Sequence, residues 1–170
     1  KILSDFGISI PRGGVAYSPE NAEFKAREIG GSKWVVKAQV HSGARGKAGG
    51  IKLCDTELAV AQATDKLLGK KLITNQTGPL GKIINRVYIE EATQIEKELY
   101  LGLVFDRGSE CIMVVASTEG GMSVEEISQQ KPESIIRSKI EVAVGMQEFQ
   151  AREIAFNLGI KSELVSRTAA

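Results

Sequence analysis

The stretch from Trp34 to Gly50 constrains the fold more than any other part of the chain. It reads W-V-V-K-A-Q-V-H-S-G-A-R-G-K-A-G-G, a valine-rich segment followed by a loop of glycine and basic residues. Valine favours a pleated, half-buried strand, in which alternate side chains point to opposite faces of the sheet. Lys37 therefore lies on the face opposite to Trp34. Because a lysine is almost never buried without a partner, Lys37 either reaches water or meets a negative group in a cleft.

The loop after this strand favours a bound anion. Its glycines allow positive φ and a close approach of the backbone to a ligand, and successive N–H groups in such a loop form an anion-binding concavity. A P-loop has a glycine five residues before its Gly-Lys pair and Ser or Thr after it, whereas here His41 precedes Gly46-Lys47 at that place and Ala48 follows. The dinucleotide fingerprint G-x-G-x-x-G is also missing from the loop. The loop is therefore either a plain turn or a phosphate site of another architecture.

Composition limits the classes of function. The chain has 170 residues, with 22 basic and 21 acidic side chains, and this balance argues against a protein that binds nucleic acid through bulk charge. No apolar run approaches the ~20 residues that span a bilayer, and no signal-peptide pattern is present, so we expect no membrane partner. Cys54 and Cys111 lack C-x-x-C spacing, which indicates free thiols in a reducing compartment. Because the chain starts with lysine and ends without a cap signal, we expect it to be a piece of a longer protein.

Helix signals and their stops are clear in the first half of the chain. Ser18-Pro19 is typical of a helix start, because serine is a preferred N-cap and proline suits the first helical position. Gly30-Gly31 is the matching stop. Asp55 is expected to be the N-cap of a second helix, which we expect to end at Gly69. The apolar residues of these helices that we expect to cover one sheet are Phe24, Ile29, Leu58, Leu67 and Leu68.

Strand signals alternate with the helix signals. A hairpin is predicted over residues 98–116, because two apolar runs, L-Y-L-G-L-V-F and C-I-M-V-V-A, flank a turn at residues 106–109. Strands that pair as hairpins, mixed with covering helices, predict an α+β fold. The other expected strands are residues 34–40, 51–54, 72–73, 86–91 and 135–140, and further helices are expected at residues 124–129 and 146–158.

A second polar cluster, V-Y-I-E-E-A-T-Q-I-E-K-E from Val87 to Glu98, gathers acidic residues at the end of an expected strand. Three interpretations are open: a solvated edge, a general acid/base pair, or a site for the hydroxyls of a sugar. Glu90 and Glu91 point to opposite faces of the pleat, so one of them should face inward, and the spacing does not say which. A catalytic pair has weak support, because no nucleophile or histidine is set nearby.

His41 is the only histidine of the chain. It stands at the beginning of the glycine-rich loop, where an imidazole can simply cap a backbone group. No carboxylate or cysteine stands at metal-ligand spacing from it. The sequence therefore favours a structural position for His41 over a metal site.

Three segments together resemble one family. W-V-V-K-A-Q-V-H-S-G-A-R-G-K-A-G-G, E-A-T-Q-I-E-K-E-L-Y-L-G and A-S-T-E-G-G, in this order, closely resemble the β subunit of succinyl-CoA synthetase over essentially the whole chain. The resemblance implies an ATP-grasp fold, in which two α+β subdomains close on ATP without a P-loop. Residues 1–170 would form an incomplete ATP-grasp domain, with about 12–92 as the phosphate-loop subdomain and about 1–11 plus 93–170 as part of the second. The carboxy-terminal ligase domain would be absent from this chain.

The resemblance also implies ATP contacts, position by position. Lys37 resembles the strand lysine that contacts the ATP phosphates, and Ala44-Arg45-Gly46 resembles the loop whose backbone wraps them. Glu90 and Thr93 fall where the family receives the adenine. Glu98 falls where a carboxylate takes the ribose hydroxyls, so the acidic cluster is better interpreted as a base and sugar site than as an acid/base pair.

Two positions bear on the details of this site. The family usually has glycine where Ala44 stands, and a methyl group is tolerated there if φ is negative. Pro11 lies in a segment that resembles the purine-discriminating region of the family, and a proline there is similar to the members that use ATP. The resemblance therefore implies ATP as the nucleotide.

The reaction implied by the resemblance is a ligation that forms a carbon–sulfur bond. ATP, succinate and CoA give ADP, phosphate and succinyl-CoA, a step of the tricarboxylic acid cycle. The phosphoryl group passes through a histidine of the partner α subunit, which also binds CoA, so no catalytic residue is expected in this chain. The magnesium ligands are expected beyond residue 170, and the chain alone is expected to be inactive. The implied location is the bacterial cytoplasm or the mitochondrial matrix.

Two alternatives stay open. One is a related acid–CoA ligase, such as malate–CoA ligase or the corresponding part of ATP citrate lyase, because the nucleotide half does not carry the acid specificity. The other is a binding module without catalysis, in which Arg45 and Lys47 bind nucleic-acid phosphates. The near-zero net charge and the lack of aromatic residues in the loop count against that module, so we expect no nucleic-acid partner.

Overall fold

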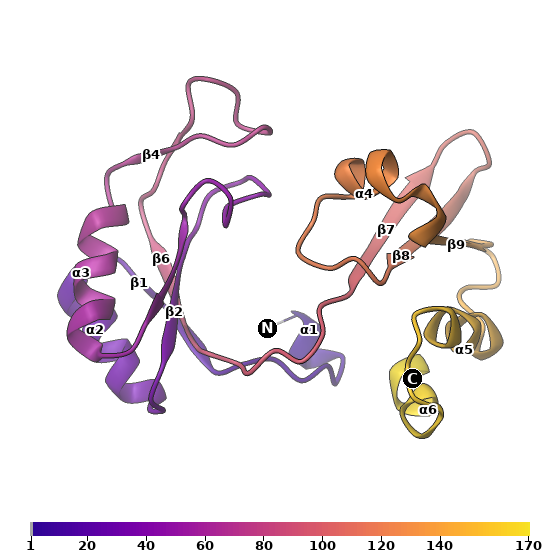
Figure 1. Cartoon of the computed structure of the whole chain (residues 1–170), viewed down its shortest axis with the longest axis horizontal. Coiled ribbons are helices and arrows are strands. Elements are labelled where there is room, and N and C mark those ends of the chain that lie inside the picture. The colour runs from indigo at the N-terminus through magenta and orange to yellow at the C-terminus, as the bar shows by residue number, and fades with distance from the viewer. Residues whose placement is uncertain (1) are drawn as a thin grey trace. The chain divides into compact units, whose positions relative to one another are not determined.

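The computed structural model describes residues 2–170, and the chain divides into two compact units, one up to Gln94 and one from Ile95 to Ala170. Each unit combines an antiparallel sheet with helices (Figure 1). The α+β class expected from the sequence is therefore confirmed. Within residues 2–170, no helix is both long enough and apolar enough to cross a membrane.

The first unit is built on a four-stranded sheet. Its elements are α1 (Ile2–Asp5), β1 (Gly13–Ala16), α2 (Pro19–Ile29), β2 (Trp34–Ala38), β3 (Ile51–Cys54), α3 (Glu57–Leu67), β4 (Lys71–Leu72), β5 (Lys82–Ile83) and β6 (Val87–Glu91). The strand order is β1-β6-β2-β3, and every neighbouring pair is antiparallel, while β4 and β5 form a separate ribbon. Helices α2 and α3 pack on one face of the four-stranded sheet (Figure 1). The central strands are therefore β2 and β6.

The two covering helices begin and end at residues with suitable capping chemistry. Ser18 is the N-cap of α2, where its side chain accepts a hydrogen bond from the backbone N–H of Asn21, and Gly30 ends the helix with a φ of +72°. Thr56 caps α3 by accepting from the N–H of Ala59. The expected cap at Asp55 is therefore wrong by one residue, since the side-chain oxygen of Thr56 satisfies the free backbone donor.

The core of the first unit lies between the helices and one face of the sheet. Burial alternates along β2, with Trp34, Val36 and Ala38 buried, as the period-2 pattern predicts. On β6, Val87 and Ile89 face the same side and are fully buried. The valine-rich strand predicted from the sequence is thus confirmed, and its apolar face points to the helices.

The helices meet this sheet mainly through small residues. Phe24 and Leu58, which we expected to cover the sheet, are 59% and 62% exposed, so that expectation is wrong for both; of the others, Ile29 and Leu67 are buried and Leu68 packs at the margin of the core. The buried positions follow the helical spacing of three or four residues, and small side chains there let the helix backbones lie close to the strands. The helix residues buried against the sheet are Ala22, Ala26, Ile29, Val60, Ala63, Thr64 and Leu67.

The second unit contains a three-stranded antiparallel sheet. Its elements are β7 (Tyr100–Asp106), β8 (Cys111–Ser117), α4 (Val124–Gln130), a 3-10 turn at Pro132–Ser134, β9 (Ile135–Ile140), α5 (Glu148–Asn157) and α6 (Ser162–Ala169). The strand order is β7-β8-β9, and the core joins Val114, Ala116 and Ile140 of the sheet to Ile154 and Leu158 of the α5 region. The predicted hairpin is therefore confirmed. Asp106 stabilises its turn, where hydrogen bonds from Ser109 and from the N–H of Gly108 lower the pKa of Asp106.

Both cysteines are buried free thiols. Cys54 ends β3 and is 4% exposed, and Cys111 begins β8 and is fully buried. Burial raises the pKa of the Cys54 thiol, and the neighbouring charge of Asp55 adds to this effect. Because the thiolate is the reactive form, Cys54 is a structural residue rather than a nucleophile.

The substitution Ile89→Ala tests the placement of the core. Ile89 is fully buried on a central strand, so its truncation should lower the free energy of unfolding by about 2–5 kcal/mol, through lost apolar burial and a residual cavity. The measurement is urea unfolding followed by the fluorescence of Trp34, the single tryptophan, which is itself buried. Leu53→Ala is the control, because Leu53 is 64% exposed on β3. Equal losses for the two variants would contradict the assignment of the faces.

Candidate functional site

The face of the first sheet that is turned away from α2 and α3 carries the lysine singled out in the sequence. The strand register places Lys37 of β2 opposite Tyr88 of β6, and Val35 opposite Glu90. Lys37 Nζ donates a hydrogen bond to Glu90 Oε1, and the two side chains are 28% and 19% exposed. The negative group beside Lys37 is thus a carboxylate from the neighbouring strand. A half-buried pair of this kind is screened by salt less than a surface pair.

The two adjacent glutamates of β6 have different surroundings. Glu90 lies on the open face with Lys37, whereas Glu91 points to the opposite face and accepts a hydrogen bond from Arg12 Nε at 2.9 Å. The hydrogen bond from Arg12 lowers the pKa of Glu91. The structure therefore resolves which of the two carboxylates shares a face with Lys37, a choice that the spacing alone left open.

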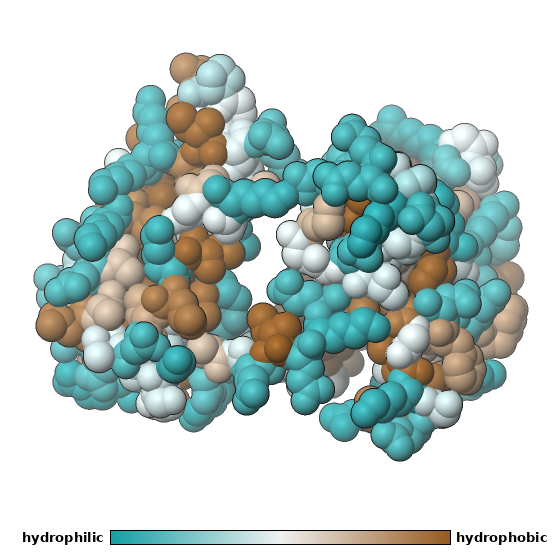
Figure 2. Space-filling view, in the orientation of Figure 1, coloured by the Kyte–Doolittle hydropathy of each residue, from teal (hydrophilic) through white to brown (hydrophobic). Residues whose placement is uncertain are grey.

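Apolar side chains accompany the charged pair on the open face. Ile51 of β3 lies opposite Lys37, and Val15 of β1 lies opposite Tyr88. Ile51 and Val15 are 37% and 38% exposed, and Figure 2 shows apolar surface among the hydrophilic surface of this unit. A face with both characters suits a ligand that combines a flat apolar part with an anionic part.

The glycine-rich loop between β2 and β3 offers backbone donors. The N–H groups of three successive residues, Ala44, Arg45 and Gly46, donate to no acceptor in residues 2–170. Ala44 has a φ of +54°, so the condition of a negative φ, under which a methyl group is easily tolerated at this position, is not met. A single left-handed residue within a loop turns successive N–H groups toward one side, which forms an anion-binding nest. The left-handed conformation also explains why glycine is the easier residue at this position.

The side chain of Arg45 closes this loop rather than extending from it. Arg45 Nη1 donates to the carbonyl oxygen of Ala38 at 2.7 Å, and the carbonyl oxygen of Arg45 accepts from the N–H of Gly50 at 2.8 Å. Both hydrogen bonds hold the middle of the loop, one at the last residue of β2 and the other at the residue before β3. The guanidinium is thus engaged within the protein, which counts against the alternative in which Arg45 binds nucleic acid.

A turn after β4 holds the other end of the loop. Gln76 Oε1 accepts from the N–H of Gly43 at 2.6 Å, and the hydroxyls of Ser42 and Thr74 share a hydrogen bond. Thr74 Oγ1 also accepts from the N–H groups of Gln76 and Thr77, at 3.2 and 3.3 Å. The sequence analysis missed these residues, although T-N-Q-T is a pattern typical of a tight turn.

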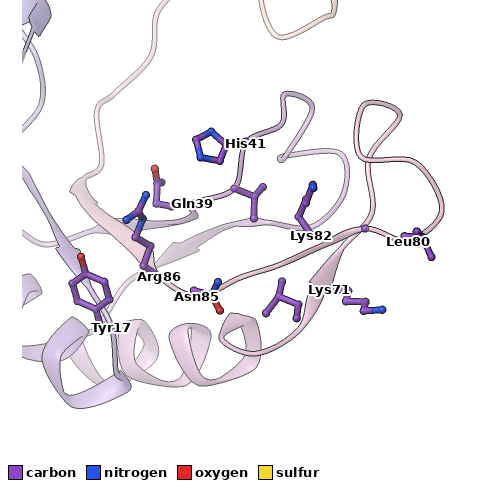
Figure 3. Close-up of a pocket in the computed structure, with 11 residues that line it drawn as sticks. Tyr17, Gln39, His41, Lys71, Leu80, Lys82, Asn85 and Arg86 are labelled. Carbon is purple, nitrogen blue, oxygen red and sulfur yellow. The ribbon is translucent and has the colours of Figure 1, made fainter.

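A pocket of about 750 Å³ opens where β2 ends and β6 begins (Figure 3). It lies next to the loop and includes Gln39 and His41, which follow β2, and Arg86, which precedes β6. His41 therefore lines this pocket. No group of three or more His, Cys, Asp and Glu side chains able to hold a metal is found among the described residues. The sequence analysis did not predict this pocket.

The remaining predicted residues belong to different units of the chain. Thr93 follows Glu90 by three residues, and its exposed side chain lies near the end of the first unit. Glu98 belongs to the second unit. There Glu98 packs against Gly120 and Gly121, where an added Cβ would collide with the backbone and side chain of Glu98. Glu98, the last residue of the segment E-A-T-Q-I-E-K-E, therefore contacts the glycines of the segment S-T-E-G-G. Both positions need glycine, because a larger residue would collide with Glu98.

The first unit is an α+β domain with a loop of backbone donors that lack acceptors among the described residues and with a lysine on an open sheet face, a combination that suits nucleotide phosphates. The whole chain, residues 1–170, matches the family of ATP-grasp domains. The chain therefore belongs to the ATP-grasp domain family, which implies ATP as the ligand of the complete domain. The fold expected from the resemblance is confirmed.

Individual proteins are also similar to this chain. The chain is 56% identical over 98% of its length to a probable malate–CoA ligase subunit beta of Mesorhizobium japonicum, of which it covers 42%. It is 48% identical over 96% of its length to the succinate–CoA ligase (ADP-forming) subunit beta of Nautilia profundicola, again covering 42%. The chain thus spans less than half the length of these relatives. Among solved structures, the dinucleotide forming acetyl-coenzyme A synthetase 1 of Ca. Korarchaeum cryptofilum has a TM-score of 0.64 at 22% identity, with 99% of this chain and 73% of that chain covered, which supports the fold alone.

The substitution Gln76→Ala tests whether the turn after β4 orders the loop. Loss of the acceptor for the N–H of Gly43 should speed hydrogen exchange at Gly43 by roughly 5- to 10-fold, as expected for one hydrogen bond of about 1 kcal/mol. Asn75→Ala is the matched control, because Asn75 is the neighbouring exposed residue of the same turn and makes no side-chain hydrogen bond among residues 2–170. The measurement is native-state amide exchange. Unchanged exchange at Gly43 in Gln76→Ala would show that this bond does not hold the loop.

Proposed function

We propose that the chain is the nucleotide-binding part of the β subunit of an ADP-forming acid–CoA ligase. The observation that carries the proposal is the pairing of Lys37 with a loop of unused backbone donors in a member of the ATP-grasp family. In the full enzyme, ATP, a dicarboxylic acid and CoA would give ADP, phosphate and the acyl-CoA. The resemblance implies succinate as the acid and the tricarboxylic acid cycle as the setting. Malate is the second candidate, favoured by 56% identity to the malate–CoA ligase subunit against 48% to the succinate–CoA ligase subunit.

In this proposal the phosphates of ATP meet two kinds of donor. Lys37 supplies a point charge, and the N–H groups of Ala44, Arg45 and Gly46 supply fixed dipoles. Together these groups position the phosphates and offset their negative charge, which is the main task of a protein in phosphoryl transfer. The left-handed φ of Ala44 and the tether of Arg45 support this role, because they fix the direction of the donors before the ligand arrives.

The base and the sugar of ATP would occupy the acidic segment. Glu90 and Thr93 are proposed to receive the adenine, and Glu98 the ribose hydroxyls. The apolar side chains beside Glu90 on the open face support a site for a flat ring. The proposal also divides the ATP-grasp domain into a phosphate-loop subdomain over about residues 12–92 and a second subdomain that includes about residues 1–11 and 93–170.

Magnesium and the transfer of the phosphoryl group belong to other parts of the proposed enzyme. No cluster of acidic, cysteine or histidine side chains fit for a metal occurs in the described residues. The proposal places the magnesium ligands in the part of the full-length subunit that the chain does not span. The phosphoryl group would pass to a histidine of the partner α subunit, which would also bind CoA, in the cytoplasm of a bacterium or the mitochondrial matrix.

The test is an assay of the full-length β subunit with its α partner, ATP and CoA, in which succinate and malate are compared. Formation of an acyl-CoA with either acid supports the proposal, and the ratio of the two kcat/KM values assigns the acid. No acyl-CoA with either acid, from a complex that binds ATP, would overturn it.

In the same assay, Lys37→Ala should abolish turnover. Removal of a positioned charge at the phosphates is expected to lower kcat/KM by about 100-fold or more, while the melting temperature stays close to that of the wild type. Lys52→Ala is the control, because Lys52 is an exposed lysine of the adjacent strand on the other face of the pleat. Retained turnover in Lys37→Ala would remove Lys37 from the site.

The 170-residue chain without the rest of the subunit should be inactive and should bind ATP weakly or not at all. The physical reason is that Lys37 and the loop donors form only part of the proposed site, without magnesium ligands. Isothermal titration calorimetry of the chain with Mg-ATP measures this directly. Binding in the micromolar range would contradict the expectation.

A further inference from the structure

The pocket at the ends of β2 and β6 has a defined place beside the proposed phosphate loop. The N–H of Gln39 donates to the carbonyl oxygen of Arg86 at 3.0 Å, so these two residues are neighbours across the central strands. Ala16 pairs with Val87, and one further step along the strands brings Tyr17 beside Arg86. The residues Tyr17, Arg86 and Gln39 therefore form a row across the sheet, two residues along the strands from Tyr88 and Lys37 (Figure 3).

The charge of the pocket is one-sided. Its lining includes Lys71, Lys82, Arg86 and His41 and contains no carboxylate, although acidic and basic residues are nearly equal in the chain as a whole. Within residues 2–170, neither Lys82 nor Arg86 forms an ion pair, while other basic side chains such as Arg12, Lys25 and Arg27 do. Uncompensated cations around a hollow concentrate anions from solution.

The donor side chains of the pocket point in different directions. Figure 3 shows the side chain of Arg86 rising toward Gln39 and His41, whereas Lys71 points away from them. The side-chain nitrogen of Gln39 is already used, since it donates to the carbonyl oxygen of Lys37 at 2.9 Å. The donors left for a ligand include the guanidinium of Arg86, the ammonium of Lys82 and the hydroxyl of Tyr17.

We propose that this pocket is a phosphate-binding subsite, separate from the nucleotide, in which Arg86 is the principal anchor and Lys82 the second charge. A guanidinium presents parallel donors that match two oxygens of a phosphate, and a lysine adds a point charge. The nucleotide phosphates would use Lys37 and the loop, which leaves Arg86 and Lys82 for a second phosphate group. The subsite rests on the proposed function for its role, because phosphate and ADP are the products of that reaction.

The experiment is a calorimetric titration of the full-length β subunit with inorganic phosphate, at fixed ionic strength, with and without saturating Mg-ADP. Arg86→Gln and Lys82→Gln should each weaken phosphate binding by about 10-fold or more, as for loss of a charged hydrogen-bond donor. Lys70→Gln should leave it within twofold, because Lys70 is an exposed lysine beside β4 that lies outside the pocket lining. The affinity for Mg-ADP, measured on the same samples, should stay within twofold in every variant, which also shows that the variants are folded.

Three outcomes would overturn the subsite. The first is an unchanged phosphate affinity in both Arg86→Gln and Lys82→Gln. The second is competition between phosphate and Mg-ADP, which would place the phosphate in the nucleotide site. The third is tighter binding of succinate or malate than of phosphate, lost in the same variants, which would make the pocket a dicarboxylate site. Failure of Mg-ADP to bind at all would instead count against the proposed function, and phosphate binding that depends on Arg86 would still support the subsite.

Discussion

The antiparallel pairing of β2 with β6 is the interaction on which the first unit depends. It places Val36 opposite Ile89 on the face that the helices cover, and Lys37 opposite Tyr88 on the other face. A slip of one residue would turn the apolar set to solvent and Lys37 into the core, so the burial of the valines also sets the direction of the lysine. Burial of the apolar residues thus determines the face on which Lys37 lies, although this burial does not stabilise its charge.

The candidate site takes most of its donors from the backbone, and its precision comes from the residues that hold the backbone. Arg45 and Gln76 each use a side chain to bind the loop, one at its middle and one at its start. Ala44 contributes its backbone N–H and its positive φ, and its side chain carries no donor. The chemistry of such a loop is therefore hard to recognise from residue types, because the groups that face a ligand are the same in every amino acid except proline.

The local parts of this fold could be predicted from the sequence, and the parts set by distant contacts could not. The pleat of β2 follows from a period-2 pattern, and the β7-β8 hairpin follows from two apolar runs around a turn, so both depend on residues that are close in sequence. Phe24 lies off the buried side of α2, which Ala22, Ala26 and Ile29 form, so its size does not lead to burial. The strand β1 has only four residues, which is too short for a clear periodic pattern. The pocket near Arg86 combines side chains from well-separated segments, so only the folded chain brings them together. The positive φ of Ala44 likewise belongs to a loop that is held by hydrogen bonds from Arg45 and to Gln76.

The ion pair between Lys37 and Glu90 gives the free protein an internal competitor for its own ligand. In the proposed function, a nucleotide has to draw the ammonium away from a carboxylate that already binds it, and the apparent affinity is the intrinsic affinity multiplied by the fraction of molecules in which the pair is open. A weakly charged molecule gains too little from Lys37 to shift this equilibrium, whereas a triphosphate gains more. In the proposed function, the pair would thus lower the apparent affinity of every ligand that needs a free Lys37, and only an anion that binds the ammonium strongly would overcome this cost at low concentration.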